Sequence, residues 1–597
     1  MIKLDFPIMM LAVLIPIIAS LFLPFLAKKI KNKFLVLISF ILLLFPPVTA
    51  GILALNFELD PGILDAVFFQ FPAVGSFSMY LDWLSGLYIL GIGVVTPLVG
   101  IYSKRYMEHR IEVLEAQGDD APSLGIYYMF YIIFSISMSG VVLSTNLIQF
   151  YIFLKLSVIG SFFLILLYGY GERKKTALIY LVWSSIAGFV FLVGSLGFAS
   201  SLGTFDTIDL QSLEVKMGIG EGLHILIPLA LFMGMYIKKA IFGAHIWLPY
   251  AHADAPTPIS ALLSPNLIGI SGWAMVRIVY ELFPIQFETM SLFFLVISFF
   301  TMMYGGVMAL AQTNLKRLMA YISVSQMGWV VFGFATLTIE GIVGGVLLFV
   351  KHSLSLSILF MSAGLLISDC GGLKEIPDMK ALKKKVPVNS FLMISGFLIL
   401  MGFPLTMGFW SKAMIFSGAT KMDFVTGMPS FLFMAALLLL AGSITAAYAL
   451  ITLKRILFSS DTPETKKRDT FKPIGWNSST IPMAILAGLG FLLFFLPGPL
   501  LGAAEMPSTS HLVMEGGAFL IVYFISFYLY QGKPEELSRL LFEKFEVNII
   551  DRFYHHQLGA GIKKMGSALQ TAHNGVMSNY MLWMVAGFLI IILYFLL

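Results

Sequence analysis

The sequence is short of two residue classes on which most soluble proteins depend. Only 12% of its 597 residues are charged, against about 25% in a soluble globular protein, so too few charges remain to cover a water-facing surface. Its single cysteine, Cys370, excludes a disulfide framework and an iron–sulfur cluster held by cysteines of this chain alone. A nucleotide-binding loop and a flavin motif are lacking as well. We therefore expect no cofactor and no redox active site in this chain.

Long apolar segments are what the sequence has instead. It is 58% hydrophobic with a mean hydropathy of +0.90, and its apolar residues come in blocks of about 20, the length that a helix needs to cross a hydrocarbon core of about 30 Å. These blocks predict an all-α integral membrane protein with about sixteen transmembrane helices and no soluble domain. The first block is predicted to be a retained helix rather than a signal peptide. The predicted spans are 7–27, 33–56, 81–103, 123–145, 146–169, 174–201, 222–246, 257–282, 288–311, 315–336, 339–368, 387–417, 428–457, 479–501, 512–530 and 577–597.

Basic residues alternate along the chain in a way that predicts its orientation. Loops rich in Lys and Arg alternate with loops that contain more Asp and Glu, as at 58–65 and 206–209. Because cytoplasmic loops carry an excess of Lys and Arg, we expect the basic loops in the cytoplasm and both termini outside. The clusters are short and separated by apolar spans, which argues against a nucleic-acid partner. Lys and Arg gather in every second loop, at 28–33, 104–110, 173–175, 316–317, 383–385 and 466–468.

The segment 531–576 departs from this pattern. It is too polar to span, yet apolar residues recur in it at helical spacing, for example Leu541, Phe545 and Ile549. This spacing predicts an amphipathic lateral helix on the cytoplasmic surface before the last span, 577–597. The alternative is an ordinary interfacial loop helix.

Ionisable residues inside predicted spans are costly, about 2.5–3.5 kcal/mol each on insertion scales, so they are functional candidates. We find Lys155, Lys238, Lys239, Lys351 and Lys412, with His352 beside Lys351. No Asp or Glu stands near the middle of a span. Because desolvation lowers the pKa of an amine, a row of buried lysines can pass protons near neutral pH. The alternative interpretation is a set of amines bonded to backbone carbonyls at helix breaks.

Two helix breaks accompany these lysines. The run 242–249 contains His245 and Pro249 and follows Lys238, and the run 402–409 contains Pro404 and precedes Lys412. Discontinuous helices at matching places in two halves are typical of inverted-repeat transporters. We therefore predict two inverted five-helix repeats. The predicted domains are 1–122, with three helices; 123–282 and 283–457, the two repeats; 458–530, with two helices; 531–576, the lateral helix; and 577–597, the last helix.

The residue sequences around these breaks are characteristic of a known family. Residues 237–249 and 255–262, residues 314–328 and residues 402–412 resemble the antiporter-like subunits of complex I, of Mrp cation/proton antiporters and of membrane-bound hydrogenase-related complexes. The resemblance covers about residues 80–460. It implies two inverted five-helix repeats, a midplane row of ionisable groups, and a lateral helix that clamps neighbouring antiporter-like subunits. It also implies an energy-transducing cell membrane and an assembly with peripheral subunits that carry iron–sulfur clusters.

The resemblance assigns family positions to some residues and not to others. Lys238 matches the family's seventh-helix lysine, Lys412 the twelfth-helix lysine or glutamate, and His352 an eleventh-helix histidine. Lys155 stands where the family usually has a glutamate. The eighth-helix lysine or histidine is replaced, with Gly269 and Ser264 as candidate positions, and Leu356 aligns with the eleventh-helix lysine, near Lys351.

These observations favour an antiporter-like subunit of a redox-driven, multi-subunit ion pump that translocates protons, or exchanges sodium for protons, through the buried lysines and histidines. The alternative is a largely structural subunit with a degenerate channel, which the altered positions motivate. A third reading, a stand-alone solute permease, has the spans but no evident substrate pocket.

Overall fold

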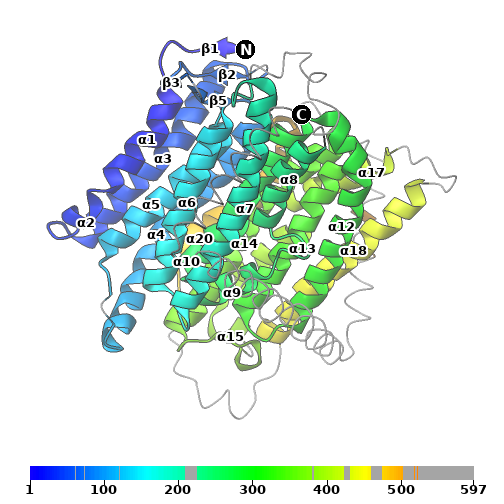
Figure 1. Cartoon of the computed structure of the whole chain (residues 1–597). Coiled ribbons are helices and arrows are strands. Elements are labelled where there is room, and N and C mark those ends of the chain that lie inside the picture. The colour runs from blue at the N-terminus through cyan, green and yellow to red at the C-terminus, as the bar shows by residue number, and fades with distance from the viewer. Residues whose placement is uncertain are drawn as a thin grey trace, which may run out of the picture. The chain divides into compact units, whose positions relative to one another are not determined.

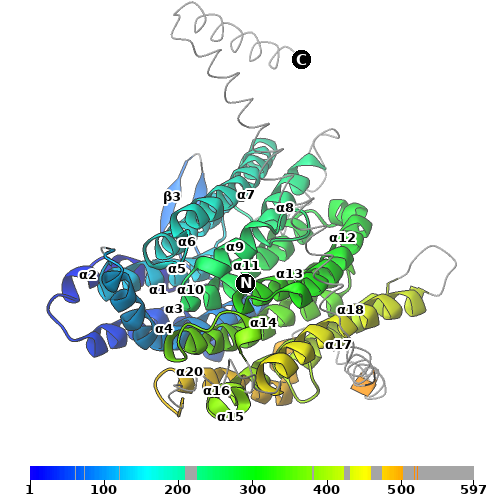
Figure 2. The same cartoon turned by 90° about the horizontal axis from the view of Figure 1, so that it is seen from below.

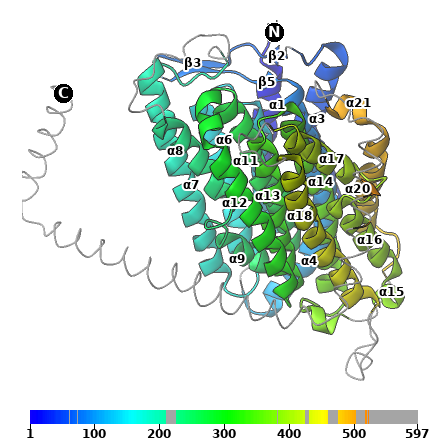
Figure 3. The same ribbon diagram turned by 90° about the vertical axis from the view of Figure 1, so that its right-hand side faces the viewer.

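The computed structural model describes residues 1–60, 62–72, 74–119, 121–208, 225–379, 382–422, 430–458, 474–501, 516–517 and 521. Helices dominate this part of the chain and run roughly side by side in one bundle (Figures 1 and 3). The α-helices are α1 Ile8–Ser20, α2 Leu23–Leu26, α3 Asn32–Asn56, α4 Trp83–Ala116, α5 Leu124–Leu143, α6 Leu147–Tyr168, α7 Arg173–Leu202, α8 Leu226–Lys238, α9 Trp247–Asp254, α10 Thr257–Leu262, α11 Ile268–Ala274, α12 Pro284–Ala311, α13 Leu315–Ala335, α14 Ile339–Asp369, α15 Leu382–Lys385, α16 Pro387–Met401, α17 Met407–Thr420, α18 Ser430–Leu453, α20 Thr480–Leu492 and α21 Pro497–Leu501.

The helices fall where the apolar blocks predict them. Among the described residues, ten helices are long and apolar enough to cross a membrane, and four shorter apolar helices accompany them. Each of the first fourteen predicted spans coincides with a helix or a broken helix. The spans predicted at 512–530 and 577–597, and the lateral helix predicted at 531–576, lie outside the described residues.

Short strands at one end of the bundle are a feature that the sequence analysis missed. β1 (Ile2–Lys3) pairs parallel with β2 (Ile63–Leu64), which pairs antiparallel with β5 (Tyr80–Leu81). β3 (Phe69–Phe71) and β4 (Gly75–Phe77) form a hairpin. The segments are two or three residues long, too short for an alternating pattern to identify them in the sequence.

Side chains tie this strand-bearing end together. Asp206, after α7, accepts from Ser76 N at 3.1 Å and from Asn146 Nδ2 at 2.6 Å, while Asn146 Oδ1 caps α6 by accepting from Ile148 N at 2.9 Å. The acidic loops therefore meet at one end of the bundle.

The basic loops meet at the opposite end, where α15 lies (Figure 1). Arg110 donates to Tyr168 O at 3.1 Å and also to Gly169 O, so it caps the carboxyl end of α6. Arg105 pairs with Asp369 at 3.2 Å. The charge alternation in the sequence thus sorts the described loops into two groups at opposite ends.

The centre of the bundle is the long helix α14, with α13 beside it (Figure 2). In its apolar window α14 is 94% buried, and α13 is fully buried, whereas only 39% of the α7 window is buried. A helix that is apolar all round and buried belongs to the interior, and one with a wide apolar exposed face belongs to the lipid- or partner-facing surface.

Both predicted helix breaks are present. Between α8 and α9 the chain passes through Ala240 (φ 55°) and Gly243 (φ 87°), and between α16 and α17 through Gly402 (φ 75°) and Leu405 (φ 69°). These left-handed conformations stop an α-helix and free its last carbonyls. Pro404 lies within its break, whereas Pro249 lies in the first turn of α9, where a proline is tolerated because its missing N–H needs no partner.

The long helix 257–280 also deviates from regular α geometry. It contains two π-helical stretches, η2 (Leu263–Leu267) and η3 (Met275–Tyr280), between and after α10 and α11. A third, η5 (Lys454–Phe458), ends α18. Such stretches widen a helix locally and are frequent at functional sites. The remaining short turns are 3₁₀-helices, η4 (Ile376–Asp378) and η6 (Leu493–Phe495).

Candidate functional site

Two of the predicted lysines meet at the break between α16 and α17. Lys351 lies near the middle of α14 and Lys412 in the second turn of α17, and both are fully buried. Lys351 Nζ donates to Leu400 O and Lys412 Nζ to Met401 O, each at 2.8 Å. These carbonyls belong to the last turn of α16, where the partial negative charge of the helix dipole collects. The break therefore supplies acceptors for two buried amines.

A polar chain continues from Lys351. Its Nζ donates to Gln326 Oε1 of α13 at 2.5 Å, and Gln326 Nε2 donates to Tyr448 OH of α18 at 2.6 Å. Lys412 Nζ also lies 5.0 Å from the centre of the Trp329 ring, within reach of a cation–π interaction. Lys351 is therefore held inside the bundle, between α13 and α16.

Lys239 lies at the other break, directly after α8, and is also fully buried. A Cβ on Gly272 of α11 would lie 2.8 Å from Lys239 Nζ and 2.7 Å from Tyr88 OH of α4, so both groups converge on that glycine. Within the described ranges, neither polar atom has a hydrogen-bond partner. Because buried polar groups are nearly always hydrogen-bonded, internal water is the partner that suits this site.

Two buried histidines accompany these lysines. His352 of α14 and His252 of α9 are fully buried, and no ring nitrogen of either has a hydrogen-bond partner in the described part of the chain. The ionisable neighbours of His352 are Lys351, Lys239 and His252. His352 therefore links the two breaks, and we call Lys239, His252, His352, Lys351 and Lys412 the core row.

Lys155 and Lys238 form a separate pair beside α7, with Lys238 buried. Lys238 Nζ donates to Ser184 Oγ of α7 at 3.2 Å and lies 5.3 Å from the centre of the Tyr180 ring. Lys155 of α6 is half-buried, and its Nζ packs on Gly188 of α7, where an added Cβ would lie only 2.6 Å away. Ser184 and Gly188 are one helical turn apart, so the two amines are neighbours of like charge.

His245 occupies a different place again. Its Nε2 lies 3.2 Å from Tyr304 OH of α12, and its ring lies 6.0 Å from that of Phe242. Of the seven predicted site residues, the structure thus gathers Lys239, His352, Lys351 and Lys412 in the core row. It places Lys238 and Lys155 beside α7, and His245 against α12.

The sequence analysis missed His252 and treated Lys316 as a loop residue. Lys316 is buried at the start of α13, where it donates to Ala253 O at 3.2 Å and also to Ala255 O. It therefore caps the carboxyl end of α9, the helix that carries His252. A histidine three residues after Pro249, directly behind the predicted helix break, is the signal that would have found it.

At the altered family positions, apolar or hydroxyl side chains pack where the family has ionisable groups. The ring of Phe349 occupies the space that a side chain on Gly269 would need, and it stacks on Tyr88 with ring centres 4.1 Å apart. Ser264 hydrogen-bonds Ser323, and Leu356 is fully buried. The core row therefore has no amine from α10 or α11.

The core row also has no carboxylate. Among the described residues, the one buried acidic side chain is Asp65, which lies at the strand-bearing end and accepts from Met10 N at 2.9 Å at the start of α1. Burial raises the pKa of Asp65 to about 7 and outweighs its backbone hydrogen bonds. Within the described ranges no His, Cys, Asp and Glu side chains are grouped in threes as a metal ion would require. The core row therefore consists only of amines and imidazoles, and these groups can accept and release protons without a carboxylate.

Comparisons with known proteins find relatives among membrane subunits of oxidoreductase and antiporter complexes. Residues 144–439 match the family described as NADH:quinone oxidoreductase/Mrp antiporter, TM. The chain is 26% identical over 477 residues to NAD(P)H-quinone oxidoreductase chain 4 2 of Trichodesmium erythraeum, covering 77% of this chain and 79% of that protein. It is 27% identical over 395 residues to F(420)H(2) dehydrogenase subunit M of Methanosarcina mazei, covering 65% and 75%. With NADH-quinone oxidoreductase subunit M of Rhodobacter capsulatus, the identity is 26% and the match spans 61% of that protein.

Solved structures share the fold. A chain of respiratory complex I from Thermus thermophilus superposes with a TM-score of 0.68 at 21% identity, covering 86% of this chain and 99% of that chain. A chain of the Mrp complex from a Dietzia species superposes with a TM-score of 0.78 at 20% identity, covering 98% and 62%.

Proposed function

Because residues 144–439 belong to the NADH:quinone oxidoreductase/Mrp antiporter family, and the chain is an antiporter-like membrane subunit, we propose that it translocates protons through the core row. Exchange of sodium for protons is the variant of the same function that the Mrp relatives suggest. The chain lies in an energy-transducing membrane as one subunit of a larger complex.

The observation that carries this proposal is a set of buried ionisable groups that have no hydrogen-bond partner among the described residues. In that part of the chain both ring nitrogens of His252 and His352 and the amine of Lys239 are unpaired, all inside the bundle. An imidazole with two available nitrogens can take a proton on one and release one from the other. Water bound between these groups can complete the path to Lys351 and Lys412. A purely structural row would pair its polar groups with protein, as Lys351 and Lys412 do.

The position of His252 indicates at which end of the bundle protons enter the core row. His252 lies on α9, near its carboxyl end, where Lys316 holds the helix close to the basic loops. We infer that protons pass between His252 and the cytoplasm, and that His352 hands them to the two lysine-bearing breaks. The basic loops are then cytoplasmic, as the positive-inside rule predicts.

The driving force comes from outside this chain. The proposal includes other membrane subunits, among them further antiporter-like ones, and peripheral subunits that carry iron–sulfur clusters. It also retains the two five-helix repeats, 123–282 and 283–457, with their breaks at equivalent places, and a lateral helix over 531–576 that runs along neighbouring subunits. Support for these parts is the family membership and the placing of the breaks after α8 and α16.

The test is ion uptake by the purified complex in proteoliposomes, with the electron-transfer rate followed in parallel. Lys351→Met removes a core-row amine and keeps the side-chain volume. Lys421→Met is the matched control, because Lys421 is an exposed lysine that pairs with Glu340 at the rim of the bundle. We expect uptake per electron in Lys351→Met to lose the share that this chain carries beside the further antiporter-like subunits, and uptake per electron in Lys421→Met to stay at the wild-type value. Unchanged uptake per electron in Lys351→Met, in an intact complex, would favour the structural alternative.

A further inference from the structure

Lys155 is placed where an isolated bundle in lipid would not hold an amine. It lies near the centre of the 22-residue helix α6, and its Nζ rests on Gly188, near the centre of the 30-residue helix α7. An amine that snorkels extends toward the membrane surface. This one lies level with the middle of both helices. Among the described residues it makes no ion pair, and its neighbours are the Tyr151 ring, 5.2 Å away, and the like charge of Lys238.

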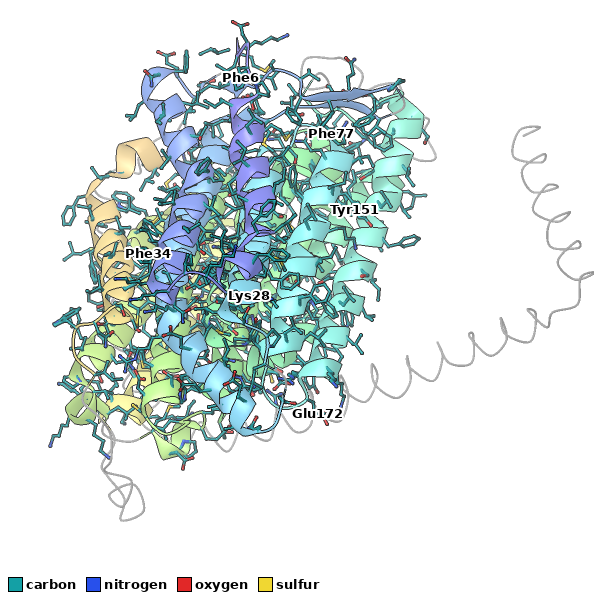
Figure 4. All side chains as sticks on the ribbon, turned by 90° about the vertical axis from the view of Figure 1, so that its left-hand side faces the viewer. Phe6, Lys28, Phe34, Phe77, Tyr151 and Glu172 are labelled. Atoms are coloured by element: carbon teal, nitrogen blue, oxygen red, sulfur yellow. The ribbon has the colours of Figure 1, made fainter. Side chains whose placement is uncertain are left out.

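The face around Lys155 is apolar and exposed on the bundle. Figure 4 shows Tyr151 on the outer surface of α6, between Phe77 at one end of the bundle and Glu172 at the other. Ile152 and Ile159, each 43% exposed, flank Lys155 along the same stripe of α6. On α7 the adjoining stripe contains Val182, Ile186, Phe189 and Val193. We call this surface the α6–α7 face.

Three kinds of occupant can cover the α6–α7 face, and charge separates them. Lipid tails would leave the amine in hydrocarbon, where a charge is costly. A second copy of this chain, related by two-fold symmetry, would bring Lys155 against its own equivalent, and no described helix of this chain carries a carboxylate at that depth. A different membrane protein with an Asp or Glu in the middle of a transmembrane helix would neutralise the amine.

We propose that the α6–α7 face is the docking surface for a second, different membrane subunit, and that a carboxylate in a transmembrane helix of that subunit pairs with Lys155. The apolar stripes on both sides of Lys155 supply the packing area, and the charge pair fixes depth and register. Polar pairs inside a membrane interface are a recurrent means of such specificity. The carboxylate would also come within about two helical turns of Lys238, because both amines lie along one side of α7.

The first test places the photo-cross-linker p-benzoylphenylalanine at Ile159 in the intact complex, in its native membrane. Ile159 is one turn from Lys155 and leaves the charge itself in place, so the variant does not disturb the proposed pair. We expect a cross-linked peptide from another subunit whose transmembrane sequence contains Asp or Glu. The matched control is the same cross-linker at Phe293, which is 54% exposed on α12, and it should not give that peptide.

The second test changes the charge. Lys155→Glu should lower recovery of the cross-linked subunit in the purified complex by about tenfold or more, because it places two carboxylates together. Lys155→Arg should retain that subunit, and replacing the partner's carboxylate with Lys should restore assembly of the Lys155→Glu chain. Cross-links to lipid only, to a second copy of this chain or to a peptide without Asp or Glu would each overturn the proposal, as would full recovery of the subunit with Lys155→Glu. These readouts do not depend on ion translocation, so the docking surface and the proposed function can fail separately.

Discussion

The two helix breaks share a backbone design and differ in how they treat their lysines. Each break contains a glycine and a non-glycine residue in the left-handed region, Gly243 with Ala240 and Gly402 with Leu405. At the α16–α17 break the carbonyls of Leu400 and Met401 bind two amines. At the α8–α9 break Lys239 has no protein partner among the described residues.

This difference separates two tasks within one row. Carbonyl acceptors at a helix end fix the amines of Lys351 and Lys412 in place. Lys239 has no such acceptor among the described residues, so its amine is the one placed to exchange a proton with internal water. His352, which has Lys239 and Lys351 as neighbours, stands where the two behaviours meet.

The first prediction concerns the glycines. Gly402→Ala should lower the free energy of unfolding by about 3 kcal/mol, because it forces a left-handed alanine and brings its Cβ to 2.8 Å from Gly408 O. Gly243→Ala should cost only about 1 kcal/mol, since no atom lies within 4 Å of its Cβ. Thermal unfolding in detergent compares the two. Equal losses would show that the breaks are packed alike.

The second prediction compares the lysines. Lys351→Met should destabilise the protein by about 2 kcal/mol, because Gln326 Oε1 and Leu400 O lose their donor. Lys239→Met should leave stability unchanged or raise it by up to about 1 kcal/mol, because it removes a buried amine that has no hydrogen-bond partner in the described part of the chain. Denaturant titration of the two variants measures the difference. A loss in Lys239→Met as large as that in Lys351→Met would remove the distinction between the breaks.

The third prediction concerns what the breaks share. Ala240→Gly and Leu405→Gly should each stabilise the fold by about 0.5 kcal/mol, since relief of the left-handed conformation is partly offset by the entropy that glycine adds to the unfolded chain. The midpoint of thermal unfolding should therefore rise slightly in both. A fall in either one would mean that its side chain contributes packing that its backbone conformation does not reveal.

The fourth prediction concerns Asp65, the one buried carboxyl among the described residues, in contrast to the buried amines. Its pKa is raised to about 7 in the fold, against about 3.9 in an unfolded chain, so the fold binds the proton more tightly. Its contribution to stability is then fully present at low pH and is lost as pH rises from about 4 to about 7. Asp65→Asn should flatten that part of the pH–stability profile and leave ion uptake unchanged. An unaltered profile would contradict the assignment.

How much could be predicted from the sequence depends on the range of the interaction involved. Apolar block length predicts α4, α6 or α14 because crossing a membrane is a local requirement, and Pro404 with Gly402 predicts a break for the same reason. The sequence also indicates that lysines are buried. It does not indicate which carbonyl each lysine reaches, because Lys351 and Leu400 are 49 residues apart and meet only when α14 packs on α16.

Two residues show, in opposite directions, where prediction from the sequence stops. Lys316 sits in a basic cluster and reads as a solvated loop residue, yet it is buried and caps α9. Lys155 lies in the middle of a span and reads as part of the relay, yet it lies at the edge of the bundle, against Gly188. In both, the helix that packs alongside decides the role, and that helix is far away in the sequence.

The central claim is that both breaks serve a single path for protons. It is tested most directly by ions moved per electron in proteoliposomes that contain Lys239→Met, Lys351→Met or the double variant. If one path runs through both breaks, each single variant loses this chain's whole share of the uptake per electron and the double variant falls no further, because residues that act as a unit are not additive. If each single variant instead keeps about half of that share and only the double variant loses it, the breaks serve separate paths and the account is contradicted.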